Sequence, residues 1–144
     1  MLPMVPLLRL LRPANIITAV SDILAGIAIA VFASQTGWAE WQISSTVLLV
    51  FSTIGLYGGG VVLNDVFDAE LDKLERPERP IPAGLISKKT AGIAGILLLT
   101  GGVLMAGFVH ETLFFSSTLY IALAIALAAI FYDKWGKHLT LFGP

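Results

Sequence analysis

Carboxylates are concentrated in one short stretch of an otherwise apolar sequence. Six of the ten Asp and Glu residues lie between Asp65 and Glu78, in the run NDVFDAELDKLERPERPIP, which also carries three basic residues: Lys73, Arg76 and Arg79. On a helix, acids at successive turns repel one another by roughly 0.2–0.5 kcal/mol per pair unless a cation lies between them. Carboxylate and amide oxygens suit Mg²⁺, which often completes its shell with substrate phosphate. The stretch therefore indicates a cation site, and the neighbouring arginines suit a diphosphate group.

Helical geometry extends this polar face into the preceding apolar segment. At about 100° per residue, a helix gathers five polar side chains within an arc of roughly 100°; they are Asn64, Asp65, Asp68, Asp72 and Glu75. Counting back along the same face gives Gly60, Tyr57 and Thr53. A second polar stripe lies nearer the N-terminus, at Asn15, Thr18, Asp22 and Gly26. We predict that both stripes line one cavity, because a carboxylate facing lipid costs roughly a few kcal/mol.

These patterns also have plain structural explanations. A loop rich in charged residues is usually just solvated, and Asp22 can satisfy an Asn or Thr on a neighbouring helix. The small residues around Gly58-Gly59-Gly60 and Gly101-Gly102 are typical of close packing between membrane helices. The spacing alone leaves a cation site and a solvated loop both open.

The composition is that of a membrane protein. Of the 144 residues, 56% are hydrophobic and 13% are charged, whereas a typical soluble domain has about 25% charged residues. The sequence contains no Cys, and His110 and His138 lie far apart, which argues against disulfides and a zinc cluster. The net charge of −1 gives no reason to expect a nucleic-acid partner.

Four apolar segments are long enough to cross a bilayer: residues 14–33, 43–63, 90–109 and 113–132. Each is close to the ~20 residues that span a ~30 Å hydrocarbon core as a helix. The first is too long for the apolar region of a signal peptide. We therefore predict an all-α integral membrane protein, in which residues 1–144 form a single transmembrane domain in the lipid bilayer.

The basic residues predict the orientation of these helices. With four spans, the N-terminus, the loop at residues 64–89 and the C-terminus lie on one side of the membrane. All nine Lys and Arg residues fall on that side: Arg9, Arg12, Lys73, Arg76, Arg79, Lys88, Lys89, Lys134 and Lys137. The positive-inside rule makes that side cytoplasmic. We expect a multi-pass protein of the cell membrane, plasma or inner.

Motifs of a known family occur in order along this chain. NDVFDAELD at residues 64–72 resembles the NDxxDxxxD motif of the UbiA superfamily of intramembrane prenyltransferases. ERPERPIPAG at residues 75–84 resembles its RPxRPxxxG segment, and RPAN at residues 12–15 resembles the start of its first helix. YDK at residues 132–134, with Lys137, resembles the end of its fourth helix. The wording of the acidic run also resembles the EboC-like subgroup.

The resemblance implies a reaction and residue roles. Family members bind a prenyl diphosphate through Mg²⁺ and two Asp-rich motifs, and they transfer the prenyl group to an acceptor that is commonly aromatic. By that analogy the metal ligands are Asn64, Asp65, Asp68 and Asp72, of which Asp68 and Asp72 are catalytic. The candidate diphosphate contacts are Arg12, Arg76, Arg79 and Lys137. The substrate cavity would include Asn15, Asp22 and Tyr57, where Tyr57 either stacks on the cationic allyl group or serves in packing.

The sequence departs from the family in its second half. The family has about nine transmembrane helices and a second Asp-rich motif, whereas the only acids after Glu78 here are Glu111 and Asp133. We therefore expect the first half of a nine-helix bundle, arising from a fragment, an early stop or a gene-model truncation. Without its C-terminal half, this chain is expected to transfer no prenyl group alone.

Three other functions stay open beside prenyl transfer. A non-catalytic multispan component, such as a transport or scaffold subunit, would keep its function after Asp68→Ala and Asp72→Ala. A CDP-alcohol phosphotransferase also uses Asp-rich helices and Mg²⁺, but its pattern opens with Asp-Gly and ends in GxxxDxxxD, and neither is arranged so here. A pore has the least support, because polar stripes occur on only two of the four predicted spans.

Overall fold

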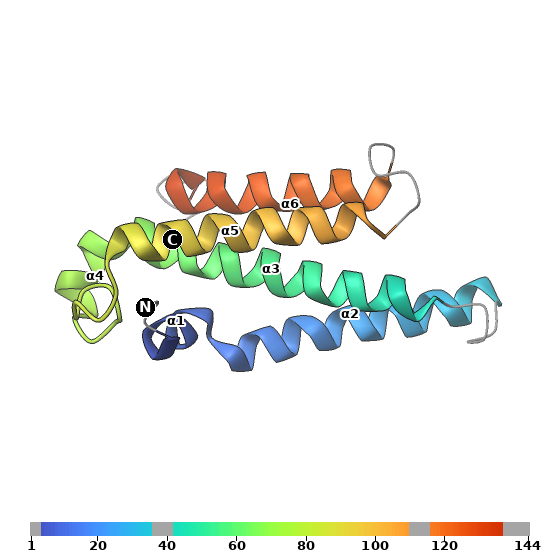
Figure 1. The fold of residues 1–144 in the computed structure, drawn as a ribbon, viewed down its shortest axis with the longest axis horizontal. Helices are drawn as coiled ribbons and strands as arrows, with labels where there is room; N and C mark the ends of the chain where they lie inside the picture. Colours follow the sequence, from blue (N-terminus) through green and yellow to red (C-terminus); the bar gives the residue numbers. More distant parts are fainter. Residues whose placement is uncertain (1–3, 36–41, 110–115, 137–144) are drawn as a thin grey trace.

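The structure is a computed structural model that describes residues 4–35, 42–109 and 116–136. Within these ranges every element is a helix: α1 (Met4–Leu11), α2 (Pro13–Ser34), α3 (Ile43–Phe67), α4 (Ala69–Glu75), α5 (Lys88–Gly107) and α6 (Ser117–Lys134). Figure 1 shows α2, α3, α5 and α6 lying along the long axis, with α1 and α4 at one end. The predicted all-α architecture is confirmed.

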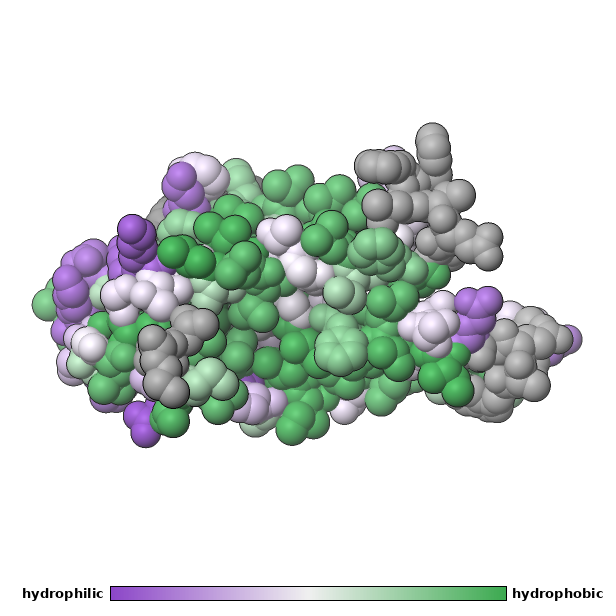
Figure 2. Space-filling model, viewed as in Figure 1, coloured by the Kyte–Doolittle hydropathy of each residue, from purple (hydrophilic) through white to green (hydrophobic). Residues whose placement is uncertain are grey.

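The long helices are the predicted membrane spans. Among the described residues, four helices are long and apolar enough to cross a membrane: α2, α3, α5 and α6. α3 runs on to Phe67, past the predicted end at residue 63, so the acidic motif begins on the second span itself. α6 begins at Ser117, and residues 113–115 of the predicted fourth span lie outside the described residues. Figure 2 shows hydrophobic surface over the middle of the molecule and hydrophilic residues gathered at the end with α4.

α3 packs most closely against α5, through glycines. A Cβ atom added at Gly55 would lie 2.7 Å from the carbonyl oxygen of Leu98, and one added at Gly102 would lie 2.7 Å from the backbone nitrogen of Leu56. A Cβ atom at Gly59 would meet the α5 backbone at 2.8 Å. Only glycine allows the two backbones to come this near, so the close-packing explanation holds for Gly59 and Gly102.

A compact loop joins α4 to α5 and closes the end of the bundle. A buried apolar cluster ties this loop to α1, α3 and α5; its members are Leu10, Val62, Ile86 and Ala91. The loop turns at Gly84, whose φ of 72° is one that glycine adopts without strain. Ser87 then caps α5, because its Oγ accepts a hydrogen bond from the Thr90 N–H at 3.0 Å. The loop is thus fixed to the bundle, and it carries Arg79 to the end of α3.

Candidate active site

A cavity of about 530 Å³ lies along one side of α3. α3 lines it with Thr53, Leu56, Tyr57, Gly60, Val61 and Asn64. The rest of the lining comes from the corner before α2, from α2 and from α6: Arg12, Ile23, Ile125, Ala129, Tyr132 and Asp133. Its volume falls within the range of roughly 300–1,000 Å³ that is usual for small-molecule sites.

The two ends of this cavity differ in chemistry. Arg12, Asn64 and Asp133 lie near the end with α4, where α2 begins and α3 and α6 end. Ile23 and Ile125 lie deeper along the helices. Thr53 and Asn64 are about 16 Å apart along α3 at the usual helical rise. A ligand that fits both ends has a polar head and an apolar tail of roughly this length.

Part of the predicted polar face lines the cavity, whereas Asp65, Asp68, Asp72 and Glu75 of that face are not lining residues. Gly60, Tyr57 and Thr53, counted back from Asn64 by helical steps, are all lining residues. Helical periodicity alone therefore located one wall of the cavity.

The predicted stripe on α2 does not line the cavity, which corrects the expectation that both stripes share it. Asn15 and Asp22 are exposed and are not among the lining residues. α2 turns Ile23 toward the cavity and buries Ile27 and Val31 instead. Because adjacent helical residues are about 100° apart, this apolar contact rotates Asp22 away.

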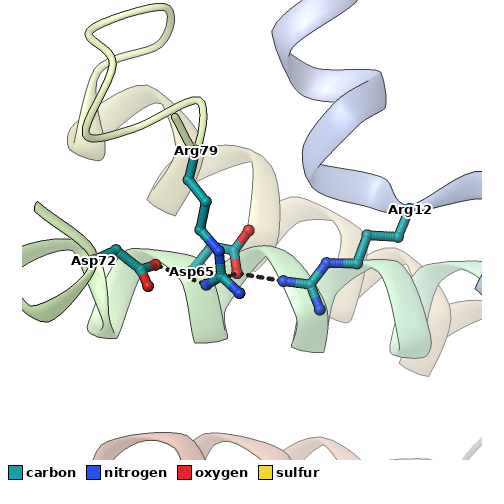
Figure 3. Close-up of polar contacts among 4 residues, drawn as sticks. All are labelled: Arg12, Asp65, Asp72 and Arg79. Atoms are coloured by element: carbon teal, nitrogen blue, oxygen red, sulfur yellow. Dashed lines mark hydrogen bonds and ion pairs between the residues drawn. The ribbon is translucent and has the colours of Figure 1, made fainter. Parts of the chain in front are cut away.

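Four charged side chains form a cluster beside the polar end of the cavity (Figure 3): Arg12, Asp65, Asp72 and Arg79. We call it the Asp65 cluster. Arg12 Nη2 donates to Asp65 Oδ1 at 2.7 Å. Arg79 Nη1 donates to the same oxygen at 3.2 Å and to Asp72 Oδ2 at 2.7 Å. The side chains of Asp65 and Asp72 are only 5% and 4% exposed. Each buried carboxylate thus has a cationic partner, as burial of charge requires.

Distinct chain segments bring this cluster together. Arg12 has a φ of 50°, left-handed and strained for a residue with a side chain, and it turns the chain into α2 before Pro13. Asp65 lies in the last turn of α3, and Asp72 lies on α4. The helix expected to run unbroken to residue 75 is interrupted at Asp68, although the Asp68 N–H still donates to the Asn64 carbonyl at 2.9 Å.

The sequence of this chain matches one known protein family. Residues 23–144 match the UbiA prenyltransferase family. The chain belongs to the UbiA prenyltransferase family. The membership predicted from the motifs is confirmed, whereas the EboC-like subgroup stays a prediction.

Individual UbiA relatives agree with this membership. The chain is 37% identical over 138 residues to a digeranylgeranylglyceryl phosphate synthase of Methanothrix thermoacetophila, covering 95% of this chain and 47% of the relative. A synthase of the same name from Metallosphaera sedula is 30% identical over 140 residues, with 96% and 45% covered. A solved structure from work on digeranylgeranylglyceryl phosphate synthase in membranes matches with a TM-score of 0.82 and 29% identity, over 99% of this chain and 47% of that one. The chain spans about half the length of the curated relatives it matches.

The UbiA family implies a bound Mg²⁺ ion. The acidic motif has oxygen atoms suited to Mg²⁺, but they are not grouped around one point. In the part of the chain that the structure describes, no three or more Asp, Glu, His or Cys side chains are grouped to hold a metal ion. Of the expected ligands Asn64, Asp65, Asp68 and Asp72, two share the guanidinium of Arg79 instead. The cation between Asp65 and Asp72 is therefore the guanidinium group of Arg79.

Three further UbiA site candidates, Asp68, Arg76 and Lys137, are not members of the Asp65 cluster. Asp68 is half-buried at the break between α3 and α4, and Arg76 is exposed. Lys137 lies outside the described residues. On α4, the exposed Glu70 Oε2 accepts a hydrogen bond from Lys73 Nζ at 2.8 Å, and this bond lowers the pKa of Glu70 below its ordinary value of 4.5.

One charged residue of the cavity lining was missed in the sequence analysis. Asp133 is 8% exposed and lies on the cavity wall, yet it was not among the predicted site residues. A signal for it existed, because it ends the fourth span on the same side of the membrane as Asn64. Carboxylates at the end of a membrane span favour an interior or aqueous position.

Proposed function

We propose that this protein takes part in the Mg²⁺-dependent transfer of a prenyl group from a prenyl diphosphate to an acceptor in the membrane. The observation that carries the proposal is the cavity with a polar end at Arg12 and Asn64 and an apolar interior at Ile23 and Ile125. A prenyl diphosphate has the same division into a charged head and an apolar chain. Family membership supports the same reaction class.

The candidate site residues have separate tasks in this proposal. Arg12 offers forked guanidinium donors to the diphosphate as negative charge develops on the leaving group. Tyr57 presents its ring to the allylic carbon as that carbon gains cationic character. Asn64, Asp68 and Asp72 are proposed to hold Mg²⁺ once the diphosphate brings further oxygen ligands, with Arg76 and Lys137 as added diphosphate contacts. The metal, when bound, would supply charge neutralisation to the leaving group.

Two classes of acceptor are candidates. The UbiA resemblance implies an acceptor that is commonly an aromatic ring. The name of the relatives describes synthesis of a digeranylgeranylglyceryl phosphate, which favours a prenylated glyceryl phosphate instead. Asp133 and Tyr132, on the α6 wall of the cavity, are placed to contact either one.

The membrane orientation belongs to the same proposal. The end of the bundle with α1, α4 and the last turn of α6 would face the cytoplasm of the cell (Figure 1), in agreement with the positions of the basic residues. The diphosphate would then enter from the cytoplasm and its prenyl chain from the bilayer.

The test is a transfer assay in lipid nanodiscs with the full-length product of the gene, which we call the intact protein. Labelled geranylgeranyl diphosphate is offered with Mg²⁺ and either an aromatic acid or geranylgeranylglyceryl phosphate. Asp68→Ala is expected to lower transfer about 100-fold, and Glu75→Ala, which removes an exposed acid of the same stretch, is the matched control. Unchanged function in Asp68→Ala would favour the non-catalytic membrane component.

The 144-residue chain by itself is expected to be inactive in this assay, because its sequence holds a single Asp-rich motif. Turnover by that chain alone, abolished by Asp68→Ala, would contradict this expectation.

A further inference from the structure

Asp65 is a metal-ligand candidate by its place in the motif, but its contacts suit another role. One oxygen, Oδ1, accepts hydrogen bonds from both Arg12 and Arg79. A Mg²⁺ ion binds carboxylate oxygens at about 2.0–2.1 Å. An ion at this oxygen would therefore lie directly against two guanidinium groups and would have to displace at least one of them.

Arg12 connects Asp65 to the cavity. Its side chain is 37% exposed, and it lines the cavity while its Nη2 is held by Asp65. An arginine has several rotatable bonds, and ordering them at the moment of binding costs conformational entropy. The ion pair with Asp65 orders the Arg12 side chain before the ligand binds, so binding itself carries less of this cost.

Arg79 and Asp72 hold Asp65 from the other side. Arg79 is 18% exposed, and its Nη1 bridges Asp65 and Asp72. It is not a lining residue of the cavity. The contacts thus form a chain from Asp72 through Arg79 and Asp65 to Arg12, and only its last member reaches the cavity (Figure 3).

We propose that Asp65 is a positioning residue, which orients the Arg12 guanidinium toward the diphosphate of the substrate and does not bind the metal. Arg79, anchored by Asp72, keeps the Asp65 carboxylate in place. This role rests on the proposed function as far as the diphosphate is concerned. It assigns Asn64 and Asp68 to metal binding and Asp65 to orienting an arginine. Asp72 would serve both, with Oδ2 on Arg79 and its other carboxylate oxygen for the metal.

The direction in which Asp65→Asn changes anion binding tests this role. If Asp65 only neutralised nearby arginines, Asp65→Asn would strengthen the binding of an anion, because it removes a negative charge. If Asp65 orients Arg12, the same substitution weakens binding. Glu70→Gln is the matched control, since it removes one negative charge from an exposed carboxylate on the adjacent α4.

The experiment measures binding of inorganic diphosphate to the intact protein in lipid nanodiscs by calorimetry, with EDTA and then with Mg²⁺. Asp65→Asn is expected to weaken binding about tenfold in EDTA, as loss of an orienting partner does at other sites. Glu70→Gln is expected not to weaken it. The change in half-saturating Mg²⁺ concentration should be small for Asp65→Asn and large for Asp68→Asn.

A double substitution separates positioning from a general effect on the fold. In the Arg12→Gln background, Asp65→Asn should weaken binding no further, because the group that Asp65 orients is gone. Should Asp65→Asn not fold, Arg12→Lys replaces it. This variant keeps the charge but loses the fork that reaches Asp65 and the ligand together, so weaker binding is again expected.

Several results would overturn the proposal. Asp65→Asn with unchanged or stronger diphosphate binding but a lowered melting temperature would show a purely structural ion pair. A large shift in the Mg²⁺ requirement of Asp65→Asn would show a metal ligand. Absence of diphosphate binding by the wild type in EDTA would remove the Arg12 site itself, whereas transfer activity with Mg²⁺ would still leave the proposed function standing.

Discussion

One side of α3 packs against α5 so closely that a Cβ atom does not fit, whereas another side lines an open cavity. Gly59 and Gly60 are neighbours in sequence and belong to these different sides. A Cβ atom at Gly59 would lie 2.8 Å from the Gly95 carbonyl oxygen, while one at Gly60 would have Ala129 at an ordinary 3.8 Å. The same residue type therefore allows close packing at one position and lines a cavity at the next.

α5 repeats this difference. A Cβ atom at Gly102 would meet the α3 backbone at 2.7 Å, but one at Gly101 would have nothing within 4 Å. Composition alone cannot assign such glycines, because the role depends on which face of the helix each one occupies. The packed side of α3 fixes its distance from α5, and the other side of α3 lines the cavity.

The largest expected effect is on the packed side. Gly102→Leu should destabilise the fold by about 3 kcal/mol or more, because its Cβ would collide with backbone that cannot move aside. Gly101→Leu, with open space at the same level of α5, should leave stability nearly unchanged. Unfolding of both variants in mixed detergent checks this, and equal stability would break the distinction between the two faces.

A side chain that fills the cavity should leave the stability of the fold unchanged and weaken substrate binding. Gly60→Leu places a side chain among the lining residues, where it would exclude roughly two methylene groups of the ligand. At about 0.8 kcal/mol for each, the KM for prenyl diphosphate should rise about tenfold. Gly26→Leu, at an open position on α2, is the control. An unchanged KM would place the prenyl chain elsewhere.

Tyr57 offers a finer test within the cavity. A cation–π contact of about 0.5–2 kcal/mol predicts that Tyr57→Leu lowers kcat by about 2- to 30-fold, while Tyr57→Phe keeps most of it. A packing role predicts instead that Tyr57→Leu lowers the melting temperature with kcat unchanged. Parallel kinetics and thermal unfolding distinguish the two roles.

The smallest effect is expected on the surface of α4, away from both sides of α3. Glu70 is exposed, and its bond to Lys73 lowers its pKa below 4.5. A lowered pKa in the fold means that the stabilisation is present at neutral pH and is lost as pH falls through that range. Glu70→Gln should therefore change the melting temperature only slightly at pH 7, and by less still at acidic pH. A large change would show that α4 depends on this pair.

Periodicity predicted the parts of this structure that depend on one helix at a time. The four spans and the cavity-facing side of α3 at Tyr57 and Asn64 follow from apolar length and helical spacing. Contacts between helices were less predictable. The rotation of α2 that exposes Asp22 depends on which apolar residues meet α3, and several faces of such a helix are apolar enough to do so.

The Asp65 cluster shows the same limit. The sequence indicated that stacked acids require a cation, and it placed Arg79 nearby. It did not indicate that Arg79 itself would bridge Asp65 and Asp72, because that contact depends on how the loop folds back onto α3. Local charge density is visible in sequence, whereas the pairing of charges across a turn is a tertiary property.

The most direct test of the cavity's role is photolabelling. A geranylgeranyl diphosphate analogue with a photoreactive group on its prenyl chain is bound to the intact protein in nanodiscs, and the labelled peptides are identified by mass spectrometry. We expect label on the cavity side, at Tyr57, Gly60 and Ile125, and we expect unlabelled prenyl diphosphate to compete with it. Competable label in the apolar groove between α5 and α6, at Ile96, Leu104 and Leu127, would contradict this expectation.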